Sequence, residues 1–303
     1  MKVLALSLLF FSSHLLAGLT PKATLDGGDQ FTMFAARESL FELVYKMPNG
    51  MNHKMFHRMH GKLMHAIVVN KDLSHFAHIH PSFDKKTGVF SLNLNGYSQD
   101  PDNQSLPNAV PWFGEYYLFT ETMPHLHGGG EMVMNYTRNI IHADGARGAP
   151  AGDSFWPDAR AGIGHSFTQQ NESFIAVLEY DTYDFCDRWV PKFYLSIKKQ
   201  VSRGQYEAAS GFEKWLEMGG HAVMIEKSDR PFEQKRFQHL HAFLPIAADG
   251  EFDFPFDSHI DELQSGQYKI WFQVKRHAEV LTLPFAMTYT RPERLPGDSL
   301  KCK

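Results

Sequence analysis

Short runs of alternating apolar and polar residues recur along the whole chain, separated by Gly, Pro, Asn and Asp turns. Alternation with a period of two predicts strands that bury one face. We predict seven such strands in each half of the chain. In the first half they cover residues 31–36, 40–46, 63–70, 76–80, 89–94, 115–120 and 131–138. In the second half they cover residues 173–180, 192–199, 221–226, 237–243, 251–256, 267–274 and 281–290.

Seven short strands per half favour a β-sandwich over a sheet built from βαβ units. We therefore predict an all-β protein with two tandem immunoglobulin-like β-sandwich domains, over residues 28–142 and 167–291. Residues 143–166 are rich in Gly, Ala, Pro and Asp and lack alternation, which is typical of a linker, and residues 292–303 form a tail. A short helical turn is expected before the central strand of each half, where Phe56 and Met59 align with Phe212 and Trp215.

The two halves form an internal repeat, which is clearest at their histidines. Four histidines occur in the same order in each half, within matching sequence. From Gly114 to the last histidine of the first set, and from Gly266 to the last of the second, the halves align without a gap. The two sets are His65, His78, His80 and His125, and His221, His239, His241 and His277.

The spacing of these histidines points to a metal site. In a strand, residues two apart share a face, so each H-x-H pair presents two imidazoles to one side. If the strand ends meet, each domain gains a third and a fourth nitrogen donor, a set that suits Cu(II) or Zn(II). All eight histidines are therefore candidate metal ligands. The competing hypothesis is that they are structural, surface or hydrogen-bonded residues.

Methionines favour copper over zinc. Residues 51–65 (MNHKMFHRMHGKLMH) and 123–134 (MPHLHGGGEMVM) interleave thioether and imidazole donors, which suit Cu(I) and Cu(II) respectively. The alternative is that Met51, Met55 and Met59 form an apolar helical stripe packed on the sandwich. The roles of His57, His60, His75 and His127 stay open.

The first residues of the chain indicate an exported protein, and the net charge argues against nucleic-acid binding. Lys2, an apolar run and the small residues Ala17 and Gly18 resemble a signal peptide over residues 1–17, too short to span a bilayer. We therefore expect a periplasmic or secreted protein with no membrane span in the mature chain. A formal net charge of −4 without a basic stripe argues against nucleic acid. The two cysteines, Cys186 and Cys302, could form one disulfide or stay unpaired.

Two segments resemble the YtkA-like histidine-rich exported β-sandwich domains of bacteria. They are residues 62–81 (KLMHAIVVNKDLSHFAHIHP) and 114–124 (GEYYLFTETMP). In the second half His221, His239 and His241 match, but Ala242 replaces the proline that follows H-x-H. The resemblance implies a sandwich fold and an association with copper or heavy metals in the bacterial envelope.

The chain lacks the motifs of several kinds of enzyme and electron carrier. Cys186 has no nearby histidine, which argues against a blue-copper site, and the chain lacks H-E-x-x-H and G-x-S-x-G motifs. We therefore expect an exported metal-binding protein without enzymatic activity, for sequestration or delivery of copper, with zinc as the alternative cofactor. Its partners would be the metal ion and another envelope copper-handling protein. The alternatives are an envelope interaction or adhesion module and a metalloenzyme with an open histidine-ligated site.

Overall fold

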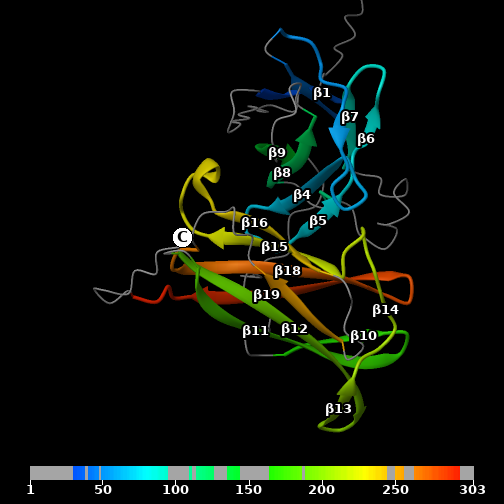
Figure 1. Ribbon diagram of the computed structural model, residues 1–303, viewed down its shortest axis with the longest axis vertical. Helices are drawn as coiled ribbons and strands as arrows, with labels where there is room; N and C mark the ends of the chain where they lie inside the picture. The colour runs from blue at the N-terminus through cyan, green and yellow to red at the C-terminus, as the bar shows by residue number, and fades with distance from the viewer. Residues whose placement is uncertain are drawn as a thin grey trace, which may run out of the picture.

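The protein is built from antiparallel β-sheets arranged as two sandwiches, one above the other (Figure 1). The computed structural model describes residues 30–37, 40–47, 49–94, 109–110, 114–125, 135–143, 164–185, 188–243, 250–255 and 263–293. Within these residues the only helix is the 3-10 turn η3 (Phe232–Gln234). The all-β prediction is confirmed.

Each half contributes an outer and an inner sheet. The outer sheet of the first half contains β1 (Gln30–Arg37), β2 (Leu40–Lys46), β6 (Ser82–Asp84) and β7 (Val89–Asn93). Its inner sheet contains β3 (Phe56–His57), β4 (Met64–Asn70), β5 (Phe76–Ile79), β8 (Gly114–Pro124) and β9 (Asn135–Ala143). In the second half the outer sheet contains β10 (His165–Gln169), β11 (Glu172–Phe185), β12 (Arg188–Ser202), β13 (Gln205–Ala208) and β17 (Glu251–Pro255). The inner sheet contains β14 (Phe212–Glu213), β15 (Gly220–Lys227), β16 (Phe237–Ala242), β18 (Gly266–Arg276) and β19 (Glu279–Tyr289).

The inner sheets repeat one another in strand order and in register. Their orders are β3-β8-β4-β5 and β14-β18-β15-β16, and β9 and β19 each pair with the long strand. His65 pairs with Glu121 as His221 pairs with Gln273. The outer sheets differ, because the second half adds the hairpin partners β10 and β13.

The fourteen predicted strands all overlap observed strands, but five short or edge strands escaped prediction: β3, β6, β10, β13 and β14. The helical turn expected at Phe56 and Met59 is wrong. Phe56 pairs with Pro124 in the inner sheet, and Met59 bridges to Lys62 across a tight turn. That turn places His60 at φ 47° and Gly61 at φ 80°, backbone angles that an α-helix does not contain.

Three hydrophobic cores follow from the alternation of side chains on the inner strands. On β4, Ala66 and Val68 face the core of their own sandwich, whereas Ile67 and Val69 face the other half. Strand β15 behaves in the same way, so both strands are buried on both faces. The core between the halves is formed by Ile67, Val69, Leu73, Phe76, Tyr117, Phe119, Val223, Ile225, Phe232, Trp271 and Ala286.

This shared core is rich in aromatic contacts. Phe76 stacks on Trp271 with ring centroids 4.9 Å apart, and Tyr117 stacks on Phe232 at 4.3 Å. Burying one large apolar side chain contributes about 1.5–3 kcal/mol, so the two inner sheets are held firmly face to face.

Some sequence predictions concern residues outside the described part of the chain. These are the signal peptide, residues 144–163 of the linker predicted over residues 143–166, and both Cys186 and Cys302. Among the described residues, no helix has the length and apolar character needed to cross a membrane.

Candidate metal centre

Six of the predicted ligands gather at the interface between the two inner sheets. His65 on β4 precedes the interface residue Ile67 by two positions, so it points toward the opposite half. His78 on β5 lies across from Ile67, and the equivalent pairing in the second half joins His239 to Val223. The strand register that builds the shared core therefore also gathers the histidines.

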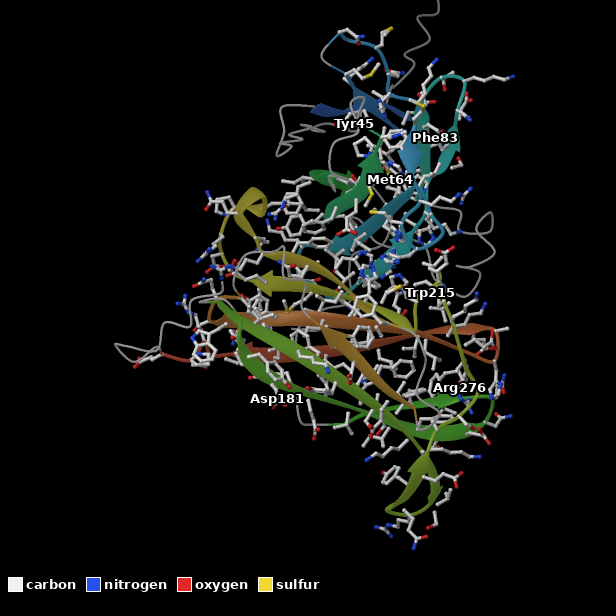
Figure 2. All side chains as sticks on the ribbon, in the orientation of Figure 1. Tyr45, Met64, Phe83, Asp181, Trp215 and Arg276 are labelled. Carbon is white, nitrogen blue, oxygen red and sulfur yellow. The ribbon has the colours of Figure 1, made fainter. Side chains whose placement is uncertain are left out.

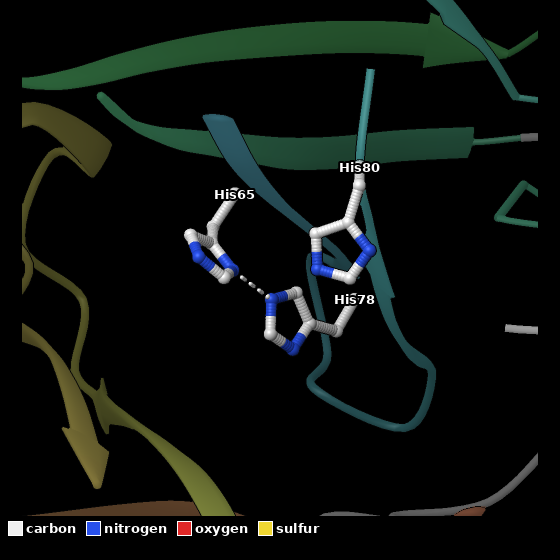
Figure 3. Close-up of side chains that lie close together, drawn as sticks. All are labelled: His65, His78 and His80. Carbon is white, nitrogen blue, oxygen red and sulfur yellow. Dashed lines mark hydrogen bonds between the residues drawn. The ribbon is translucent and has the colours of Figure 1, made fainter. Parts of the chain in front are cut away.

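The first group consists of His65, His78 and His80, whose rings converge in Figure 3. One ligand nitrogen from each residue lies within 4.8 Å of the others. His65 Nδ1 and His78 Nε2 are 2.9 Å apart. Two nitrogens bound tetrahedrally to one ion at 2.0–2.1 Å would be about 3.3 Å apart, so only small ring movements would complete a site.

The second group consists of His221, His239 and His241, and it has the same compactness. Its ring centroids are 5.4, 4.9 and 4.5 Å apart. Both ring nitrogens of His221, and Nε2 of His239 and of His241, lack a hydrogen-bond partner among the described residues. This group therefore presents a set of unused, buried nitrogen donors.

Each group is oriented by a side chain from the opposite half. His239 Nδ1 donates a hydrogen bond to Glu121 Oε2 at 2.6 Å, and His78 Nδ1 donates to Gln273 Oε1 at 2.9 Å. Glu121 and Gln273 occupy equivalent positions of the repeat. A proton on Nδ1 leaves Nε2 available for a metal, which is the usual arrangement around metal-bound histidine.

Burial keeps several of these rings neutral. The pKa values of His65, His78, His221 and His241 are lowered well below 6.5, first because burial disfavours the charged form and then because of the neighbouring imidazoles. Neutral imidazole is the form that coordinates metal.

In the first group, the contact between His65 Nδ1 and His78 Nε2 contains no proton when both rings are neutral. His65 Nε2 lies 3.1 Å from the carbonyl oxygen of Met59, so a neutral His65 carries its proton there. His78 carries its own proton toward Gln273. The 2.9 Å contact between His65 Nδ1 and His78 Nε2 then joins two lone pairs, and a cation between them removes the repulsion.

Two further residues complete the surroundings. The ring of His60 lies 4.0 Å from that of His241, in the opposite half, and burial followed by the nearby His239 lowers the His60 pKa. Trp215, near the interface in Figure 2, contacts His221 at 4.8 Å and His78 at 5.5 Å edge to face. His60 and Trp215 therefore bridge the two groups from opposite halves.

The structure does not bring His125 and His277 into this group. Each follows by four residues the position that pairs with His65 or His221, which is about 13 Å along a strand. His125 is exposed and its ring lies 4.7 Å from that of His57. His277 is exposed in the turn between β18 and β19. The prediction of four ligands per domain therefore reduces to three.

The structure shows where three of the four histidines with an open role lie. His60 joins the group, and His57 pairs with His125 instead. His75 is buried beside Tyr116, whose ring belongs to the core of the first sandwich. His127 lies outside the described residues.

Sequence reasoning missed Glu121, Gln273 and the cross-half role of Trp215. The first two had a usable signal, because each is a polar residue two positions after an aromatic residue of the shared core, Phe119 or Trp271.

A comparison with known protein families gives a match in the second half of the chain. A family described as a domain of unknown function (DUF8832) matches residues 190–291, a segment that carries the second histidine group and Gln273. No curated protein matches the chain.

Proposed function

We propose that this chain is an exported metal-binding protein that holds copper in the two histidine groups between its sandwiches. The observation that carries the proposal is the pair of equivalent, buried three-histidine sets at one interface. Three imidazoles and an open position form a site that copper or zinc accepts.

A metal explains features that structural histidines do not. A buried polar group without a hydrogen-bond partner costs about 1–3 kcal/mol, and native proteins contain few of them. His221 alone buries two such nitrogens, and His239 and His241 one each, among the described residues. In an interaction module with structural histidines nothing would compensate these costs, whereas a bound metal would be coordinated by the same nitrogen atoms.

Exposed methionines support copper over zinc. The helical stripe considered for Met51, Met55 and Met59 has no helix beneath it, and the first two side chains are 59% and 40% exposed. Met47, Met51, Met55 and His53 line a surface pocket of about 520 Å³. Exposed thioethers beside an imidazole are soft donors suited to capturing Cu(I).

Burial of the site favours sequestration over delivery. His65, His78 and His221 are almost fully buried, so a bound ion would leave only slowly. Delivery to another envelope copper-handling protein would require access through the partly exposed His60, His80 and His241.

The test is metal stoichiometry in purified protein and in two variants. Wild type loaded with Cu(II) and passed through a desalting column should retain two ions per chain, measured by plasma mass spectrometry. Replacing His78 and His80 with Ala should remove at least one of them. The matched control replaces the two exposed histidines, His125→Ala with His277→Ala, and should retain both. Retention of no copper or zinc by wild type would refute the proposal.

A further inference from the structure

The six histidines form one cluster, not two separated sites. Ring centroids within a group are 4.5–5.4 Å apart. Across the groups they are equally close: His65 to His239 5.4 Å, His78 to His239 5.2 Å, His78 to His221 5.8 Å and His65 to His221 6.0 Å. Ions held by the two groups would therefore be neighbours.

The number of donors fits two ions better than one. A tetrahedral ion accepts four ligands, so six imidazoles exceed the need of a single ion. Each group of three leaves one coordination position open, and the rings of the two groups face each other across the interface. Protein sites with two metals hold them about 3.5–4 Å apart, a distance at which one small ligand contacts both.

The charge of the cluster favours an anion as that shared ligand. Imidazole is neutral when it coordinates a metal, and Glu121 is hydrogen-bonded to the cluster through His239. Glu217 acts on the cluster from further out, beside His60. Two divalent ions carry four positive charges, and the carboxylate of Glu121 beside the cluster offsets only one of them. The excess positive charge would be buried, which is unfavourable unless it is compensated. A bridging anion would supply that compensation.

Three rings at the edge of the cluster are partly exposed and mark where a small ligand would enter. His80 and His241, the second members of the two H-x-H pairs, are partly exposed, and so is His60 between the halves. The other members, with Trp215 against them, are closed from solvent. Because Nε2 of His80 and of His241 is itself buried, a ligand of a few atoms would have to enter past these rings, and a large substrate would need the sandwiches to separate.

We infer that the two groups form one dinuclear copper centre that binds a small anion, of the hydroxide or azide class, as a bridge between the ions. The inference rests on the proposed function, because it requires metal in both groups. It adds that the ions are coupled and that their open positions are shared. A site of this kind coordinates an exogenous ligand, which a purely sequestering site has no need to do.

The test measures copper content and electron paramagnetic resonance on the same Cu(II)-loaded sample, with azide as the probe. Two coupled Cu(II) ions cancel each other's spin, so we expect two coppers per chain with less than a tenth of the copper visible in the spectrum. Azide should bind with a stoichiometry of one per two coppers and produce an azide-to-copper charge-transfer absorption.

A variant that empties one group provides the internal control. His239→Ala with His241→Ala should leave one copper per chain, with nearly all of it visible by paramagnetic resonance. The exposed pair His125→Ala with His277→Ala should behave as wild type. Two coppers in wild type that are both fully visible, or one azide per copper, would overturn the coupled centre and leave copper binding intact. One copper per chain would overturn it as well, and absence of copper would refute the proposed function itself.

Discussion

Acidification of the metal-free protein should destabilise it steeply below pH 6.5. His65, His78, His221 and His241 all have pKa values lowered well below 6.5 in the folded state, mainly by burial. In the unfolded chain each returns to about 6.5. Below that pH the unfolded chain binds more protons than the folded one, so stability falls as pH falls; above it all four are neutral in both states and stability is flat.

The size of the effect follows from the number of buried rings. At pH 5.5 each histidine that stays neutral when folded lowers the free energy of unfolding by about 1.4 kcal/mol, and four lower it by about 6 kcal/mol. Domains are stable by only about 5–15 kcal/mol, so the metal-free protein should be near unfolding at pH 5.5. Glu121, the carboxylate facing the cluster, can offset part of the loss once a proton enters.

The assay is urea unfolding of chelator-treated protein at pH 7.5, 6.5 and 5.5, followed by circular dichroism. His221→Phe removes one buried ring of similar volume and should recover about 1.4 kcal/mol of the loss between pH 7.5 and 5.5. His277→Ala, at an exposed position, should leave the loss unchanged. Equal stability of wild type at pH 7.5 and 5.5 would refute the reasoning, because it would mean that the cluster accepts protons freely.

Three other predictions test the surroundings of the centre. Glu121→Ala should weaken copper affinity about 10- to 100-fold, as loss of a side chain that orients a ligand does; calorimetric titration checks this, and Glu115→Ala, at the partly exposed start of the same strand, should have no effect. Phe76→Ala should cost about 3–5 kcal/mol of stability, because it removes a ring stacked on Trp271 in the shared core, and urea unfolding with no loss would contradict the packing. Cu(II) should quench indole fluorescence through Trp215, which contacts two of the histidines, so Trp215→Phe should lose much of the quenching while copper content is unchanged.

The sequence predicts the strands of this fold well because short apolar segments are separated by turn residues along the whole chain. On β4, Ala66 and Val68 face one core while Ile67 and Val69 face another. In the sequence this strand is a continuous apolar run, which predicts burial but not that its two faces belong to different cores. Short edge strands such as β3 and β14 have two residues each, too few for any period to appear. The immunoglobulin-like topology stays a prediction.

The histidine groups were predictable from the repeat, but their meeting was not. The spacing of His78 and His80 fixes a common strand face, which the sequence reveals. The sheet that packs against this face depends on how the two sandwiches pack together. The local sequence pattern does not determine that arrangement. Gly114 to His125 aligned without a gap, so His125 shared the repeat although its strand carries it away from the interface.

The hydrogen bonds that Glu121 and Gln273 accept from histidines of the opposite half have the pattern that a two-fold axis generates. In an isologous dimer, residue i of one subunit meets residue j of the other, and j meets i. A single half standing alone would thus carry everything needed to pair with its own copy and to build the six-histidine cluster on the axis. Joining the copies in one chain removes the requirement that equivalent positions be identical. This chain uses that freedom, since a carboxylate stands on one side of the axis and an amide on the other, and His60 has Leu216 as its counterpart. If each group binds an ion, as proposed, the two ions would therefore differ in affinity and redox potential, which two ions in a symmetric dimer would not.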